Sequence, residues 1–386
     1  MTKVLLAIAF VLAPALVHAQ TALSLEKLTS LSQETVVYVG DNIDSTVVYQ
    51  DGRETGRESF DHRYGSSPAI LNSIVRTPLT ESFVLTHPTA SEYVFVYLHG
   101  ITDSAFQGKD LARELFNAGH NVISARLSGH GSDSSRVNTI ELEDWRSDVD
   151  QAVLKAAQLG KKVVLIGLST GAALAVDRAF RNPIGIEAII PIAPAIGIAN
   201  RFVNLLEKMR LFPLIAALKP YVGAVSDEQV EVRQLNKGSH SVHVLYQLGM
   251  AVQREVRTQT TQVRGLIVTS DQDTAIQAER IPELLASMPN GEWLNIVERA
   301  SQHEPVQAQE GRRITLTVEK APIHSGLVYA PKYIAHVDSD VVAAEEGARP
   351  IVPFATSLEA NLAFPQMMTK ILQPFATCQG SLKQKN

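Results

Sequence analysis

The sequence contains a single cysteine, Cys378, among 386 residues. One cysteine excludes an intrachain disulfide framework and a cysteine-rich metal site. Basic residues form no dense block and the net charge is −5, which argues against a nucleic-acid partner, because phosphates call for a basic patch. Hydrophobic residues make up 45% of the chain, enough to bury a large core. We therefore expect one large domain, or one domain with an insertion.

The N-terminus carries an apolar run at residues 4–17 after the basic Lys3, and the run is too short to span a membrane comfortably. The sequence VHAQ at residues 17–20 fits a secretory cleavage site after Ala19. We interpret residues 1–19 as a signal peptide, and expect an exported, soluble protein that is periplasmic or secreted. An uncleaved anchor is the alternative. A bacterial-type lipid anchor is disfavoured, because no cysteine follows the run.

Short apolar runs alternate with helical patterns along much of the chain. This alternation predicts an α/β fold with a mainly parallel sheet covered by helices on both faces. Such sheets carry their sites at the carboxyl ends of the strands. The predicted strands are residues 93–98, 121–125, 162–166, 187–193 and 265–269, and the predicted helices are residues 109–118, 142–156 and 170–180.

Two regions depart from this alternation. Residues 195–264 contain helical patterns but no convincing core strand, and we interpret them as a helical cap inserted over the strand ends. Residues 20–75 are polar and rich in turn signals, which indicates an N-terminal extension with one hairpin. The core would then consist of residues 76–194 and of residues 265–386, the latter including a C-terminal tail.

The strongest chemical signal is the sequence IGLSTG at residues 166–171, which follows an apolar run and opens a predicted helix. The pattern Gly-x-Ser-x-Gly is weak alone, and a glycine-rich turn with an incidental serine is the alternative. Between a strand and a helix, however, the glycines leave room for close packing and the hydroxyl of Ser169 projects from the sheet edge. The N–H groups of the helix that begins at Thr170 point toward developing negative charge. This context indicates a nucleophile.

The sequence HGIT at residues 99–102 ends the first strong strand. Acyl transfer requires two N–H donors aimed at the oxyanion, and we expect them to be the backbone groups of Ile101 and Thr170. A simple strand-ending turn is the alternative interpretation. His99 is interpreted as structural, because the acid and the base should come later in this chain order.

The acid is expected after the strand at residues 265–269, where SDQDTAI supplies both Asp271 and Asp273. Asp271 lies closer to the strand end, and Asp273 lies in the turn beyond it. Either carboxylate could orient a histidine, and the other would then cap a turn.

Together these segments resemble α/β-hydrolases of the monoglyceride lipase, lysophospholipase and carboxylesterase type. The resemblance is carried by YLHGITDSAFQGKDLARELFNAGHNVISARLSGHGSDSS, VVLIGLSTGAALA and IVTSDQDTAI. It covers residues 90–200 and 263–276. It implies Ser169 as nucleophile, Asp273 as acid, and the backbone of Ile101 and Thr170 as oxyanion hole. We assign no chemistry to His130, whose loop is expected to shape the core near the site.

The histidine base has two main candidates. His303 lies thirty residues after Asp273, a spacing typical of this fold, whereas His324 lies fifty-one residues on. The period-two pattern at residues 313–319 predicts one more strand, and a short loop then presents His324. The segment that follows resembles the closing part of some bacterial α/β-hydrolases, which favours His324 over His303. His240 and His243 in the cap and His336 in the tail are less favoured.

The resemblance implies a serine hydrolase that cleaves acylglycerols, lysophospholipids or small carboxylic esters through a Ser-His-Asp triad, without metal or organic cofactor. The substrate would be a small-molecule or lipid ester, compatible with transient contact with a membrane or lipid surface. Two alternatives stay open. One is a thioesterase, acyltransferase or peptidase with the same triad, and the other is a non-catalytic binding protein on the same fold.

Overall fold

The structure is a computed structural model, and it describes five long stretches of the chain and several short ones near the N-terminus. The long stretches are residues 80–131, 136–197, 237–299, 312–330 and 361–376, and the short ones are residues 23–24, 28, 31, 35–41, 46–51, 53–57, 59–60, 214 and 221–222. The signal-peptide interpretation of residues 1–19 therefore lies outside the described residues, as do His303 and His336.

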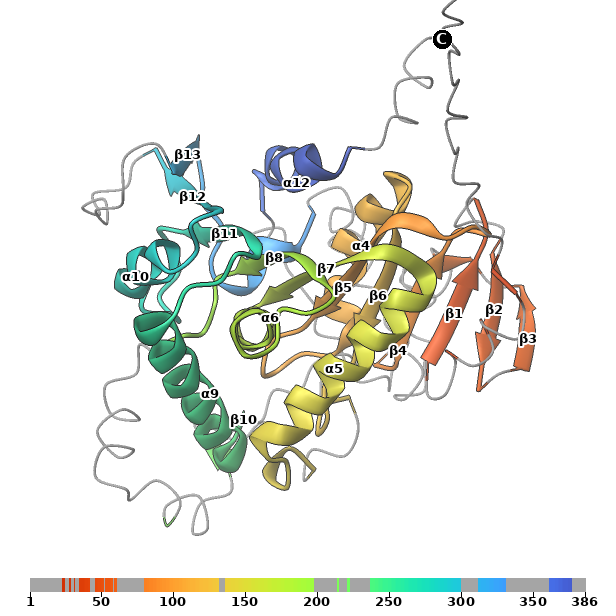
Figure 1. The fold of residues 1–386 in the computed structure, drawn as a ribbon, viewed down its shortest axis with the longest axis horizontal. Helices are drawn as coiled ribbons and strands as arrows, with labels where there is room; N and C mark the ends of the chain where they lie inside the picture. The colour runs from red at the N-terminus through yellow and green to blue at the C-terminus, as the bar shows by residue number, and fades with distance from the viewer. Residues whose placement is uncertain are drawn as a thin grey trace, which may run out of the picture.

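The described residues form one large sheet of eleven strands, in the order β13-β12-β11-β8-β7-β5-β6-β4-β1-β2-β3 (Figure 1). From β13 to β6 every neighbouring pair is parallel, while β4 runs antiparallel to β6. The fold is α/β, and the predicted strands and helices are confirmed. The strands are β1 (Thr35–Val39), β2 (Val47–Gln50), β3 (Arg53–Arg57), β4 (Ser82–Thr86), β5 (Ser91–Leu98), β6 (Asn121–Ala125), β7 (Gly160–Leu168), β8 (Ile186–Ile192), β11 (Arg264–Ser270), β12 (Gly291–Glu298) and β13 (Arg313–Val318).

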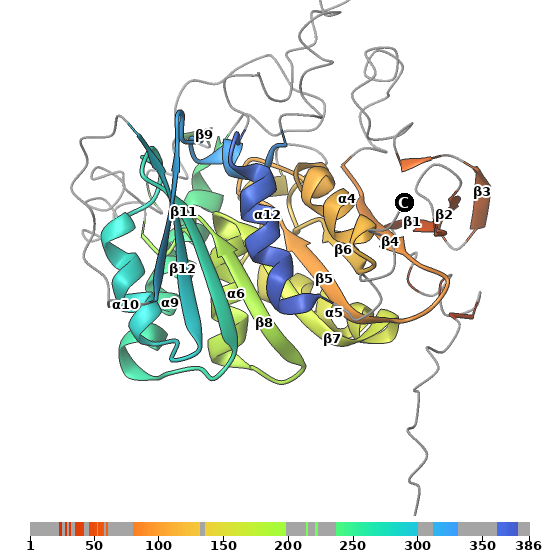
Figure 2. The same ribbon diagram turned by 90° about the horizontal axis from the view of Figure 1, so that it is seen from above.

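Helices cover both faces of this sheet, as the continuous apolar strands require. Alternate residues of β5 point to opposite faces, so that Val94, Val96 and Leu98 join one buried cluster and Phe95 and Tyr97 join another. Figure 2 shows the arrangement from above. One face carries α5 (Leu142–Leu159), α6 (Thr170–Arg181), α9 (Ser239–Thr258) and α10 (Ile281–Ala286), and the other carries α4 (Lys109–Asn117) and α12 (Phe364–Leu372).

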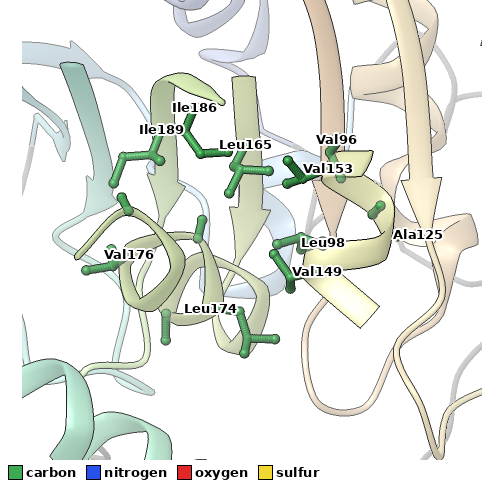
Figure 3. Close-up of a cluster of buried hydrophobic side chains, with 14 of the residues drawn as sticks. Val96, Leu98, Ala125, Val149, Val153, Leu165, Leu174, Val176, Ile186 and Ile189 are labelled. Carbon is green, nitrogen blue, oxygen red and sulfur yellow. The ribbon is translucent and has the colours of Figure 1, made fainter. Parts of the chain in front are cut away.

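Apolar side chains from α5 and α6 fill the space beneath the central strands (Figure 3). Val149 and Val153 of α5 and Leu174 of α6 belong to the same buried cluster as Leu165 of β7 and Ile189 of β8. This packing fixes α6 against the strand that precedes it. The turn between β7 and α6 is therefore held rigidly from both sides.

The N-terminal region extends the main sheet. Strand β1 pairs in parallel with β4, and β2 and β3 follow in antiparallel pairing, so the expected hairpin is part of a three-strand addition. The pairing supplies backbone hydrogen bonds to the edge that β4 would otherwise expose.

The range expected for the cap includes one helix that packs on the core. Val244, Leu248 and Val252 of α9 are buried in the cluster that also contains α6 and α5. Within residues 198–236 the structure describes only Leu214 and the short strand β9 (Tyr221–Val222). Strand β9 pairs with β10 (Lys237–Gly238), which comes directly before α9. The cap as a whole therefore stays a prediction. Within the described residues, no helix combines the length and apolar character needed to cross a membrane.

Candidate active site

Ser169 lies at the turn between β7 and α6, at the carboxyl edge of the sheet. Its backbone adopts φ 55° and ψ −111°, a conformation that costs energy for a residue with a Cβ atom. The Ser169 N–H donates to the Ile192 carbonyl at 3.0 Å, and the Ser169 carbonyl accepts from the N–H of Ala173 at 3.0 Å and of Ala195 at 3.1 Å. These three bonds hold the strained turn in place.

Two glycines allow this turn to form. A Cβ atom on Gly167 would lie 2.5 Å from the Gly171 carbonyl oxygen, and a Cβ atom on Gly171 would overlap the Leu98 carbonyl group. Helix α6 therefore lies closer to β5 and β7 than it could if any residue other than glycine stood at positions 167 and 171. The N–H of Gly171 also donates to the His99 carbonyl at 3.1 Å, which ties the turn to the loop after β5.

The two aspartates after β11 have different partners. Asp271 accepts the Glu298 N–H with both carboxylate oxygens, at 3.2 and 3.3 Å, and so joins the ends of β11 and β12. Asp273 is buried in the turn beyond, where its Oδ1 accepts the Ala275 N–H at 2.9 Å. Its Oδ2 lies 2.7 Å from Nδ1 of His324. Of the two aspartates, the structure therefore brings Asp273 to a candidate base.

His324 follows β13 in a segment that returns from the sheet edge toward α4. The Ala321 N–H donates to Oε2 of Glu298 at 3.2 Å, and the Ala330 N–H donates to Oδ2 of Asp110 at 2.9 Å. These two hydrogen bonds hold the segment in place across the carboxyl ends of the strands. The rival His303 lies outside the described residues, so the structure offers no comparison of the two.

The other described candidate histidines have local partners. His240 Nε2 lies 2.8 Å from the Ile140 carbonyl, and His243 Nε2 lies 3.0 Å from the amide nitrogen of Gln247. Both residues belong to α9, on the face of the sheet covered by α5 and α6. Neither of these contacts connects the ring to Asp273.

The loop after β5 lies beside Ser169. A Cβ atom on Gly100 would lie 3.7 Å from the Cβ atom of Ser169. Among the described residues, the Ile101 N–H has no hydrogen-bond acceptor. Thr170 is the first residue of α6, so its N–H has no partner within the helix. Both expected oxyanion donors are therefore located where the loop and the helix meet Ser169.

His99 is fully buried and has a partner on each ring nitrogen. Its Nδ1 lies 2.8 Å from the Gly100 carbonyl, and its Nε2 accepts the Leu127 N–H at 3.0 Å. Burial, together with the neighbouring His130, holds the pKa of His99 well below its usual value. The ring is therefore a neutral structural group, as its place in the chain order predicted.

The Ser169 hydroxyl and the His324 ring share no hydrogen bond among the described residues. Such bonds are often long without a substrate and tighten when one binds. In the same parts of the chain, no group of three or more His, Cys, Asp or Glu side chains could hold a metal ion.

Sequence patterns did not identify the side chains that support the site. Glu298 and Asp110 anchor the His324 segment, and Asn361 adds a third contact by donating from Nδ2 to the Leu327 carbonyl at 3.0 Å. All three lie far in sequence from the backbone groups that they bind. No local motif marks them, because their role depends only on the tertiary arrangement.

Comparison with known proteins places the chain among hydrolases. The Hydrolase_4 family model, described as serine aminopeptidase, S33, matches residues 89–310, more than half of the chain. No curated protein sequence matches the chain. A solved structure from work on LipS and LipT, two metagenome-derived lipolytic enzymes, has 19% identity and a TM-score of 0.50, and the match covers 69% of this chain and 97% of that one.

Two further similar structures are lipases. The soluble variant of monoglyceride lipase from Saccharomyces cerevisiae, in complex with a substrate analog, has 14% identity and a TM-score of 0.46, with 56% of this chain and 82% of that chain covered. The monoacylglycerol lipase of Paleococcus ferrophilus has 14% identity and a TM-score of 0.45, with 59% and 92% covered. At identities this low, structural likeness speaks to fold alone.

Proposed function

The chain belongs to the Hydrolase_4 family of α/β-hydrolases, and we propose that it cleaves carboxylic esters through Ser169, His324 and Asp273. The substrate class proposed is acylglycerols, lysophospholipids or small acyl esters. The observation that carries the proposal is the positive φ of Ser169 between β7 and α6, since this strained turn is the geometry of a nucleophile elbow. The contact between His324 and Asp273 supports the same reading.

The proposed reaction begins with proton transfer. With Nδ1–H donated to Asp273, the Nε2 atom of His324 is an acceptor that can take the proton of the Ser169 hydroxyl. The Ser169 oxygen attacks the ester carbonyl, and the N–H groups of Ile101 and Thr170 bind the oxygen that becomes negative. The protonated His324 then gives its proton to the departing alcohol. Water, deprotonated by the same ring, hydrolyses the acyl-enzyme and restores Ser169.

The central test is the substitution Ser169→Ala. The turn is held by backbone bonds, which alanine retains, so the variant should fold with an unchanged circular dichroism spectrum. Hydrolysis of p-nitrophenyl esters should fall at least about 10³-fold, the usual cost of removing a nucleophile. A fluorophosphonate should label the wild-type protein and not the variant. Substantial turnover by the variant, or an unlabelled wild type, would contradict the assignment.

A peptidase is the second candidate function, because the matching family model is described as a serine aminopeptidase. The same three side chains would cleave an amide, with His324 protonating a departing amine. Parallel assays with p-nitrophenyl acyl esters and aminoacyl p-nitroanilides distinguish the two. We expect kcat/KM to be higher for the acyl esters. A preference for the anilides would identify the peptidase.

We also propose export of the mature protein, on the N-terminal pattern at residues 1–19. Chain cleavage after Ala19 would give a protein that begins at Gln20. Mass spectrometry of the protein isolated from periplasm and medium tests this directly. A cell-associated protein that retains residues 1–19 would favour the uncleaved anchor.

A further inference from the structure

The loop after β5 that contains the candidate oxyanion donor Ile101 is held by hydrogen bonds at each successive peptide group from His99 onward. The His99 carbonyl accepts from Gly171 at 3.1 Å, and the Gly100 carbonyl accepts from the Asp103 N–H at 3.1 Å and lies 2.8 Å from the His99 ring. Three polar backbone groups of Gly100 and Ile101 remain: the Gly100 N–H, the Ile101 N–H and the Ile101 carbonyl. The Gly100 N–H and the Ile101 carbonyl are each bound by a buried side chain.

Gln107 binds the first of these groups. Its Oε1 accepts the Gly100 N–H at 3.0 Å and the Tyr97 hydroxyl at 2.9 Å, while its Nε2 donates to Oδ2 of Asp103 at 2.5 Å. Gln107 is fully buried, in the turn before α4. The amide can occupy only one orientation, because the Gly100 N–H can only donate and so needs the amide oxygen, while the Asp103 carboxylate accepts from the amide nitrogen.

His130 binds the second group. Its Nε2 lies 2.7 Å from the Ile101 carbonyl, and its Nδ1 lies 3.1 Å from the Ser128 carbonyl. The Ser128 carbonyl already accepts the indole N–H of Trp145 at 3.1 Å. A neutral imidazole carries one N–H. We place it on Nε2, because the contact with the Ile101 carbonyl is the shorter one and because the Ser128 carbonyl already has a donor in Trp145.

We infer that Gln107 and His130 are positioning residues that fix the Ile101 N–H as an oxyanion donor, by holding the peptide groups before and after it. This inference rests on the proposed function. Among the described residues, the Ile101 N–H is the polar backbone group of Gly100 and Ile101 that has no protein partner. Gln107 and His130 therefore orient the one N–H donor of this loop segment that they leave free for substrate. Donors fixed before the reaction stabilise developing charge without reorganisation.

The matched variants are Gln107→Met, His130→Leu and His130→Gln, with Ser124→Ala as control. Gln107→Met removes the bond to the Gly100 N–H together with the bonds to Tyr97 and Asp103, and His130→Leu removes the bond to the Ile101 carbonyl. His130→Gln returns an N–H donor near the position of Nε2. The Ser124 hydroxyl donates to the Ala105 carbonyl at 2.7 Å, so its removal breaks a buried bond next to the same turn without touching Gly100 or Ile101.

The readouts are kcat and KM for p-nitrophenyl butyrate, the inhibition constant of butylboronic acid, and the thermal midpoint. A boronic acid that adds to Ser169 presents a negative oxygen to the oxyanion hole, so it reports the donors directly. Gln107→Met and His130→Leu should lower kcat about 10- to 100-fold, part of the loss seen when a donor is removed outright. KM should stay within about threefold, and boronate affinity should fall by the same factor as kcat.

His130→Gln should recover most of the kcat that His130→Leu loses, and Ser124→Ala should lower the thermal midpoint while kcat stays near wild type. If Gln107→Met and His130→Leu only lower the midpoint, as the control does, the inference is overturned. If Gln107→Met or His130→Leu fails to fold, His130→Gln decides the question. The inference requires that a side-chain N–H donor to the Ile101 carbonyl be enough to keep the loop in place. A folded His130→Gln variant with low kcat and weak boronate binding, beside a Ser124→Ala variant with wild-type kcat, would contradict it. A wild type that no fluorophosphonate labels would instead defeat the proposed function.

Discussion

The Nδ1 atom of His324 lies 2.7 Å from the Asp273 carboxylate, although fifty-one residues separate the two in sequence. The Asp273 side chain is 1% exposed and the His324 side chain is 24% exposed. The buried carboxylate can hold the Nδ1–H, while the partly exposed ring can present Nε2 to a substrate. This division of roles is the one that a triad requires.

The first prediction concerns the base. His324→Ala should lower kcat for p-nitrophenyl esters by about 10³-fold or more, because no other group then accepts the Ser169 proton. His303→Ala should stay within a few-fold of wild type. Steady-state kinetics of the two purified variants, with circular dichroism to check folding, provide the measurement. An inactive His303→Ala beside an active His324→Ala would reverse the assignment.

The second prediction concerns the acid. Asp273→Asn should lower kcat by about 10⁴-fold, since an amide can hold the wrong tautomer of the histidine. Asp271→Asn is the matched control, because its carboxylate binds only the Glu298 N–H in the contacts described. An asparagine oxygen can still accept that bond, so kcat should change by no more than a few-fold. Equal losses in the two variants would mean that the turn as a whole, and not one carboxylate, supports catalysis.

The third prediction concerns the close approach of α6 to β5. Gly171→Ala should destabilise the protein by about 3 kcal/mol, or prevent folding, because the new methyl group would overlap the Leu98 carbonyl. Gly249→Ala in α9 is the control, since its Cβ atom would lie 3.4 Å from the nearest atom, the Ala195 carbonyl oxygen. It should be neutral or stabilising by up to about 1 kcal/mol. Urea unfolding measures both, and a stable Gly171→Ala would show that the helix can shift.

The fourth prediction concerns Glu255 on α9. Burial first, and the Asp177 carboxylate second, raise the pKa of Glu255 from 4.5 to about 7, against the opposing charges of Arg146, Arg254 and Arg181. Between these pH values the folded state binds more protons than the unfolded state, so this group makes stability fall as pH rises from about 4.5 to about 7. Glu255 is partly exposed, so solvent screening limits the effect to the order of 1 kcal/mol.

Glu255→Gln should remove this contribution. Relative to wild type, the variant should gain stability on going from pH 5 to pH 8, by the same order of 1 kcal/mol. Urea unfolding of both proteins at the two pH values isolates the difference, since all other titrating groups are shared. A constant difference between the two proteins would mean that Glu255 titrates normally in the fold.

The sequence by itself determined the parts of the protein that depend on neighbouring residues. Apolar runs separated by helical periodicity specify strands such as β5 and β7 and helices such as α5, because burial on both faces imposes those patterns locally. The turn at Ser169 was also readable, since the glycines that permit it lie within two residues on either side. The period-two pattern at residues 313–319 likewise predicted β13.

Only the tertiary structure decided the relationships that join distant segments. Without the family resemblance, the sequence left both Asp271 and Asp273 as candidates for the acid. The contacts in the structure separate them, because Asp271 binds the end of β12 and Asp273 binds His324. The packing of α9 on α6 has the same origin, because an amphipathic pattern records a buried face but not the partner that covers it. The hydrogen bonds of side chains such as Glu298 and His130 leave no periodic pattern in the sequence, because each forms only when the completed sheet brings two separate segments together.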